Sequence, residues 1–156
     1  RATGAEVQAP YFLVLQAETF GKMGQPEEGL AALAEASALR QRTGEQWYEA
    51  ELYRLKGELT LQSSIQSLES RIREAEECFL KAIGIARGQQ AKSWELRASL
   101  SLGRLWAQQG KHSEAQQLVR EILAWFTEGF ETTDVQEATR FLATGSTEAA
   151  SSRSQL

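Results

Sequence analysis

Side chains that could catalyse a reaction are few in this chain, and they are not grouped. His112 is the only histidine and Cys78 the only cysteine among 156 residues. No pattern supplies a nucleophile, a base and an orienting group together, and a site with several histidine ligands is excluded. The acidic pairs at 27–28 and 76–77 fall in the first turns of expected helices, where carboxylates complement the helix dipole. We therefore predict no enzymatic activity, no metal site and no cofactor.

Two arginines are the best candidates for binding. Arg97 and Arg104 lie seven residues apart, so they share one face of a helix, two turns apart. Guanidinium groups form charge-assisted hydrogen bonds with carboxylates. Together with Tyr53, the two arginines could receive an extended or helical segment that carries an acidic group. The alternative is a solvated helix face.

Helices must position these residues. Ala, Leu, Glu, Gln and Arg dominate the composition and favour helix, and the only two prolines lie near the start of the chain. Apolar residues recur at spacings of three and four over 48–59 and over 94–105, which predicts one apolar face on each of two helices. We therefore expect an all-α fold.

An internal repeat organises these helices. Six apolar positions between 75 and 86 match six positions that lie 40 residues further on, and 24–33 match 110–119 at an offset of 86. The repeat predicts three helical hairpins, about 10–42, 46–87 and 93–127. Their helices are expected at 10–23 and 27–42, at 46–62 and 70–87, and at 93–109 and 112–127.

Glycine and serine residues mark the expected ends and starts of the helices. Gly24, Gly44 and Gly110 can each take the positive-φ conformation that ends a helix. Ser70 and Ser93 are candidate N-caps, because a serine side chain can accept a hydrogen bond from the first turn.

The end of the chain follows a different pattern. Gly129 should end the third hairpin, and Thr133 or Asp134 can cap a short final helix over about 134–143. Such a helix covers the exposed face of a last repeat. Residues 144–156 are rich in serine with almost no large apolar side chains, which predicts a disordered tail.

The third hairpin carries a family resemblance. It resembles a tetratricopeptide repeat, with the family's small and large signature positions occupied by Leu102, Gly103, Trp106, Gly110, Ala115, Val119 and Ile122. The second hairpin matches at fewer positions, with Lys56 where a small residue is expected, and the first matches more weakly still. The resemblance implies a right-handed superhelix of three such hairpins with a C-terminal capping helix.

A narrower resemblance covers residues 74–142. This stretch is similar to the C-terminal repeat region of large bacterial signalling proteins that carry a predicted ATPase module, often behind a class III adenylate or guanylate cyclase domain. The chain has neither a glycine-rich phosphate loop nor an Asp pair for cyclisation. The resemblance implies a fragment that serves as a regulatory C-terminal arm of such a protein.

The tetratricopeptide resemblance also implies where a partner would bind. In that family, the first helix of each hairpin lines a concave groove. The candidate partner-binding residues mapped onto this groove are Tyr11, Glu18, Tyr53, Arg97, Leu100, Arg104 and Gln108. Further groove positions are Val14 and Lys22 on the first helix and Ala50 and Gly57 on the middle helix. Their types do not match the Lys and Asn pattern of chaperone-binding clamps.

Charge and cysteine content bound the remaining possibilities. The net charge of −4 and the lack of a Lys and Arg run argue against nucleic acid, and no apolar stretch approaches a membrane span. A single cysteine suits a reduced, cytoplasmic setting. The four tryptophans are expected in the core, with ligand stacking as the alternative.

Three functional hypotheses remain. The first is a protein-protein interaction scaffold whose partner is another protein, a peptide or a domain of its own parent chain. The second is a small-molecule-sensing regulatory domain, in which the groove or the loop at 63–70 closes over a metabolite. The third is homo-oligomerisation through an apolar edge on the first hairpin, at Tyr11, Phe12 and Val14.

Overall fold

The chain folds into helices throughout the part that the structure describes. The computed structural model describes the backbone of residues 4–153 and the side chains of residues 9–145. Over these residues it contains no strand, which confirms the all-α prediction. The helices are α1 (Gly4–Lys22), α2 (Pro26–Thr43), α3 (Glu49–Gln62), α4 (Leu68–Gly88), α5 (Lys92–Gln108), α6 (His112–Leu123) and α7 (Thr133–Arg153).

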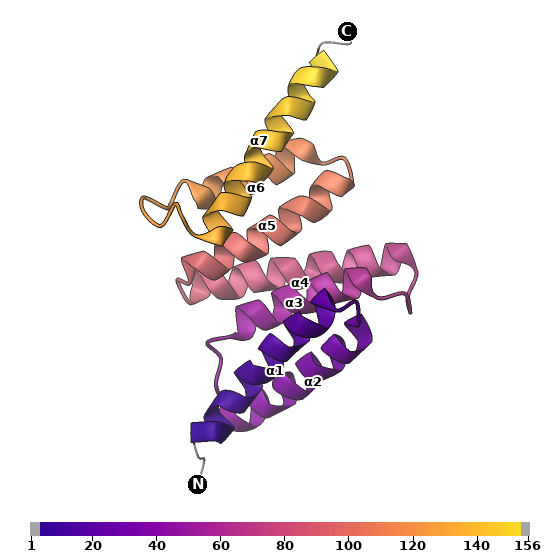
Figure 1. Ribbon diagram of the computed structural model, residues 1–156, viewed down its shortest axis with the longest axis vertical. Helices are drawn as coiled ribbons and strands as arrows, with labels where there is room; N and C mark the ends of the chain where they lie inside the picture. The colour runs from indigo at the N-terminus through magenta and orange to yellow at the C-terminus, as the bar shows by residue number, and fades with distance from the viewer. Residues whose placement is uncertain (1–3, 154–156) are drawn as a thin grey trace.

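The helices stack in chain order along the long axis of the molecule (Figure 1). Three pairs make the most extensive intrapair contacts: α1 with α2, α3 with α4, and α5 with α6. The odd-numbered helices also contact one another in sequence, from α1 through α3 and α5 to α7. By contrast, α2 and α4 do not approach each other directly. The layer of odd-numbered helices is therefore continuous, whereas the layer of even-numbered helices has a gap between α2 and α4.

Three apolar clusters hold the stack together. The first joins α1, α2 and α3 around Val14, Leu33 and Leu59, and the second joins α4 and α5 around Phe79. In the third, Val135 of α7 is buried with residues of α5 and α6. Burial of a large aliphatic or aromatic side chain stabilises the fold by about 1.5–3 kcal/mol. The final helix therefore covers the apolar face of the last pair.

Several helix boundaries differ from the prediction. The first helix begins at Gly4 rather than near residue 10, so Pro10 lies inside it. A proline in the second turn removes one helical hydrogen bond, and the ring of Pro10 is fully buried, which offsets part of that loss. The helix α3 begins at Glu49 rather than 46, and α6 ends at Leu123 rather than 127.

The end of the chain also differs from the prediction. The helix α7 continues to Arg153, so the backbone over 144–153 is helical where a disordered tail was expected. Apart from Gly145, residues 144–153 contain no proline or glycine, and a helix already nucleated on the core extends through such residues at little cost. The rest of the expected tail, 154–156, lies outside the described residues.

The caps correct the sequence prediction in detail. Ser67, not Ser70, caps α4, because its Oγ accepts a hydrogen bond from the Ser70 N–H at 3.3 Å. Ser93 lies inside α5 rather than at its cap. Thr132 caps α7 in place of Thr133 or Asp134, since its Oγ1 accepts from the Val135 N–H at 3.4 Å. In each case the chain enters the helix earlier than the sequence pattern indicated.

The turn glycines agree with the prediction. Gly24, Gly44, Gly110 and Gly129 all have positive φ, between 72° and 83°. The equivalent turn after α4 has Gln90 at a φ of 56° instead. A side chain with a Cβ is strained in this left-handed conformation.

Candidate functional site

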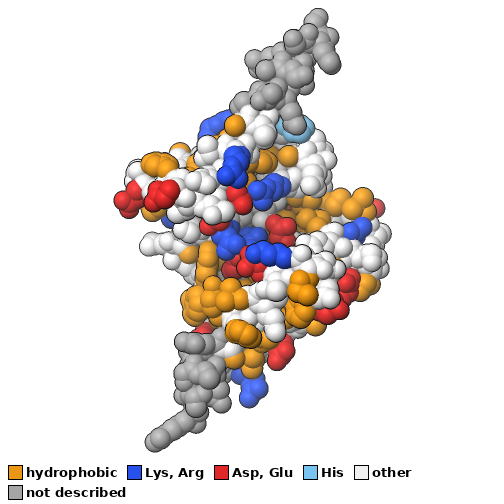
Figure 2. Space-filling model, viewed as in Figure 1, with side chains coloured by type: hydrophobic (Ala, Val, Ile, Leu, Met, Phe, Trp, Pro, Cys, Tyr) orange, Lys and Arg blue, Asp and Glu red, His pale blue; other side chains and the backbone are white. Residues whose placement is uncertain are grey.

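Charged side chains from α1, α3, α5 and α7 meet on one face of the molecule. Figure 2 shows blue and red side chains gathered at the middle of this face. They surround a cavity of about 310 Å³, which we call the charged cleft. Its lining residues are Glu18, Lys22, Arg54, Arg97, Leu100, Ser101, Arg104, Thr133, Asp134 and Glu137.

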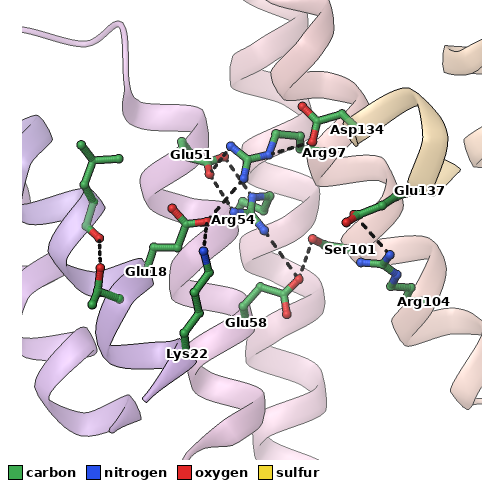
Figure 3. Close-up of polar contacts among 12 residues, drawn as sticks. Glu18, Lys22, Glu51, Arg54, Glu58, Arg97, Ser101, Arg104, Asp134 and Glu137 are labelled. Atoms are coloured by element: carbon green, nitrogen blue, oxygen red, sulfur yellow. Dashed lines mark hydrogen bonds and ion pairs between the residues drawn. The ribbon is translucent and has the colours of Figure 1, made fainter. Parts of the chain in front are cut away.

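Glu51 organises the ion pairs beneath the cleft. Its two carboxylate oxygens accept hydrogen bonds from Nε of Arg54 at 2.9 Å and from Nη2 at 2.7 Å. One of these oxygens also lies 2.7 Å from Nη1 of Arg97. Because the Glu51 side chain is only 6% exposed, water does little to weaken these contacts. One buried carboxylate thus holds two guanidinium groups (Figure 3).

Nearby carboxylates stabilise the charged form of Arg54. Burial alone would lower the pKa of Arg54, but the hydrogen bond with Glu51 and the charges of neighbouring carboxylates outweigh it and raise the pKa above its usual value. A second carboxylate, that of Glu58, lies 3.7 Å from Arg54 and accepts a hydrogen bond from Ser101 Oγ at 2.7 Å. Both carboxylates that contact the Arg54 guanidinium therefore lie on α3, and Ser101 of α5 contacts one of them.

Arg97 connects four helices. Besides Glu51 on α3, it lies 3.7 Å from Glu18 on α1 and 3.4 Å from Asp134 on α7. Burial raises the pKa of Asp134 above its usual value, and the positive charge of Arg97 opposes that effect. Arg97 is thus a bridge between elements that are far apart in the sequence, rather than a free cation.

Two cations at the rim of the cleft, Lys22 and Arg104, make longer and more exposed ion pairs. Lys22 lies 3.8 Å from Glu18 and its side chain is 77% exposed. Arg104 lies 3.5 Å from Glu137 and its side chain is 51% exposed. Ion pairs of this length between exposed side chains contribute at most about 1 kcal/mol. An incoming carboxylate can therefore compete for both cations.

The structure brings together four of the predicted binding residues. Glu18, Arg97, Leu100 and Arg104 all line the charged cleft. Leu100 lies at the bottom of the cleft and is only 3% exposed, so little of its side chain is open to a partner. Gln108 is exposed at the end of α5 and does not line the cleft.

The two predicted tyrosines lie elsewhere. Tyr11 packs against Trp47, with ring centroids 4.7 Å apart. Tyr53 is on another face of α3, where the Lys81 ammonium sits 4.3 Å from its ring centroid. Gly57, on the same side as Tyr53, lies against Phe79 of α4. Tyr53 and Gly57 therefore lie apart from Arg97 and Arg104 and do not line the charged cleft.

The charged residues of α3 were missed by the sequence analysis. Glu51, Arg54 and Glu58 are spaced three and four apart and alternate in charge sign, a pattern of one helix face. This alternation was the available signal. Charged residues usually lie on the solvent side of a helix, so this alternation did not indicate a buried pair. In the structure, Glu51 and Arg54 are only 5% and 9% exposed.

The tryptophans are only in part core residues. Trp47 and Trp125 are 49% and 59% exposed, and Trp94 and Trp106 are half-buried. Trp47 stacks on Trp94 with ring centroids 5.9 Å apart. Trp106 donates a hydrogen bond from Nε1 to Glu76 at 2.7 Å. The expectation of core packing therefore fails for two of the four.

Sites for other chemistry can be assessed over the described residues. They contain no group of three or more His, Cys, Asp and Glu side chains placed to hold a metal ion. None of the helices they form is long and apolar enough to cross a membrane. Cys78 is 7% exposed, and burial raises the pKa of its thiol. His112 is the first residue of α6 and is exposed.

Comparison with known proteins does not place the chain in a family. No protein-family model, no curated protein and no solved structure matches it. The resemblances to tetratricopeptide repeats and to cyclase-associated repeat regions therefore rest on the sequence motifs quoted above.

Proposed function

We propose that this chain is a non-catalytic protein-protein interaction scaffold of the tetratricopeptide kind, a right-handed superhelix of three hairpins closed by α7. One observation carries the proposal: every residue that lines the charged cleft comes from the first helix of a hairpin or from α7. The tetratricopeptide resemblance implies that a partner occupies the surface formed by these helices. A cleft assembled from four separate elements suits an extended or helical peptide.

The ion pairs indicate the chemistry of the partner. Arg97 and Arg54 already hold Glu51, so they position the cleft and do not receive a ligand. Lys22 and Arg104 remain exposed at the rim. A peptide with an acidic group would pair with these two cations, which are held by longer contacts than the buried network.

The setting of the scaffold follows from the resemblance of residues 74–142. We propose a regulatory C-terminal arm of a larger bacterial signalling ATPase or cyclase, in the cytoplasm. The partner would then be another protein or a domain of the parent chain. Neither nucleic acid nor a membrane is proposed as a partner.

Self-association through the first hairpin is a second candidate. Phe12 and Leu15 are 64% and 43% exposed on α1, so an apolar edge exists. Val14, expected at this edge, is instead buried in the first cluster, and Tyr11 is half-covered. Sedimentation of the Phe12→Ser variant beside the wild type tests this candidate, and a wild type that stays monomeric at high concentration excludes it.

The charged cleft is tested by matched charge reversals. Lys22→Glu with Arg104→Glu alters the rim, whereas Lys111→Glu with Arg120→Glu makes the same change on two exposed cations, one at the N-cap of α6 and one in its last turn. Both variants, with circular dichroism to check helicity, would be compared with the wild type in capture of proteins from a bacterial lysate. We expect a partner that the wild type and the α6 variant retain and the cleft variant loses. Equal retention by all three would place the binding surface elsewhere.

A further inference from the structure

A second and larger cavity lies on a different side of α3 from the charged cleft. It has a volume of about 560 Å³ and is bounded by α2, α3, the start of α4 and the loop over 63–67. The cavity exists because α2 and α4 both contact α3 but do not approach each other. Its volume falls within the range of about 300–1,000 Å³ that is typical of small-molecule sites.

The wall of this cavity is mainly apolar. Leu30 and Leu33 of α2 and Leu52 and Tyr53 of α3 line it. From the loop, Ile65 also lines the cavity, yet its side chain is 76% exposed. An apolar molecule in the cavity would remove part of Ile65 from water, which is favourable in proportion to the area covered.

Two cations at the cavity lack a carboxylate partner. Lys56 and Arg71 line it, and neither takes part in an ion pair among the described residues. Arg71 donates from Nη1 to the Leu61 carbonyl at 2.8 Å, but its buried Nε has no hydrogen-bond partner. The only acidic residue in the lining is Glu74, so positive charge is in excess.

We infer that this cavity binds a small amphipathic carboxylate, with its apolar body against Leu33 and Leu52 and its anionic head group at Lys56 and Arg71. Charge complementarity selects an anion, because a buried donor without a partner destabilises the fold and a carboxylate can satisfy several donors at once. This site goes beyond the proposed scaffold, since it lies outside the charged cleft. A bound ligand would contact α2, α3 and α4 together and so stabilise the folded chain.

Decanoate is a suitable probe, with decanol and decylamine as its neutral and cationic counterparts. Binding of each to the full chain would be measured by isothermal titration calorimetry below the concentrations at which these compounds aggregate, and by the shift of the melting temperature. We expect decanoate to bind at least tenfold more tightly than either counterpart. Equal affinity for all three, or no binding of decanoate, overturns the inference.

Three variants locate the site. Lys56→Met keeps the length of the side chain and removes its charge, so it should weaken decanoate about tenfold, the loss expected for a charge-assisted contact, and leave decanol unchanged. Ala34→Phe fills the cavity from an exposed position on α2 and should weaken both probes at least tenfold. Lys111→Met, at an exposed position before α6 that lines neither cavity, is the control and should change neither. Decanoate affinity that survives both Lys56→Met and Ala34→Phe in helical, cooperatively melting variants refutes the assignment.

Discussion

Replacement of Glu51 by glutamine tests the buried network that positions the charged cleft. Glu51 is 6% exposed at its side chain and contacts two guanidinium groups at 2.7–2.9 Å. Removing one partner of a buried ion pair costs about 3–5 kcal/mol, because the remaining charge stays buried without compensation. Glutamine keeps one oxygen acceptor in place. We therefore expect Glu51→Gln to lower the free energy of unfolding by about 3 kcal/mol, the lower end of that range.

The measurement is urea unfolding, followed by circular dichroism and by tryptophan fluorescence, with a common transition required of both probes. Glu18→Gln provides the matched control, since Glu18 is 30% exposed and its ion pairs are 3.7 and 3.8 Å long. The control should cost less than about 1 kcal/mol. If Glu51→Gln also costs less than about 1 kcal/mol with an unchanged slope, the network is solvated and does not hold the cleft.

Four further predictions each concern a single position. Gly57→Ala should lower the free energy of unfolding by about 1–3 kcal/mol, because the new Cβ would lie 2.5 Å from the Phe79 ring. Gly84→Ala, with open space around it, should instead raise that free energy by about 0.5–1 kcal/mol, and equal effects in urea titrations would contradict the packing argument. Gln90→Gly should raise the melting temperature by relieving the positive φ of 56°, and a lower value would show that the residue is not strained. Asp134→Asn should leave the melting temperature unchanged or raised at pH 7, because burial raises the pKa of Asp134 and the folded state therefore loses stability as pH rises above the usual value of 3.8. Melting curves from pH 3 to pH 7 should show this advantage disappear at the acidic end, and a clear loss at pH 7 would mean that the Arg97 contact outweighs burial.

The helical pattern was predictable because it depends on local rules. Apolar spacings of three and four together with the internal repeat indicated the helices, and glycine at Gly24, Gly44 and Gly110 marked turns with positive φ. Cap positions were less predictable, since Ser67 and Thr132 compete with similar residues only a few positions away. Which residue caps the helix depends on the backbone conformation of the loop that precedes it.

The candidate site was predictable only in part. Arg97 and Arg104 were found because their spacing of seven fixes a shared helix face, whatever the neighbouring helices are. Tyr53 was misplaced, because spacing within α3 does not say which of its faces meets α4. The close contact between Gly57 and Phe79 decides that orientation and turns Glu51 and Arg54 inward.

Residue types and spacing were enough to predict that this chain is helical. That prediction rests on local information: helix propensity and the periodicity of apolar residues. The tertiary structure alone decided which charges are buried against one another, since Arg97 meets Glu18, Glu51 and Asp134 from three other helices. It also decided that α2 and α4 stand apart around a cavity. Such features depend on how whole helices pack, and no local pattern specifies the distance between two helices that each contact a third.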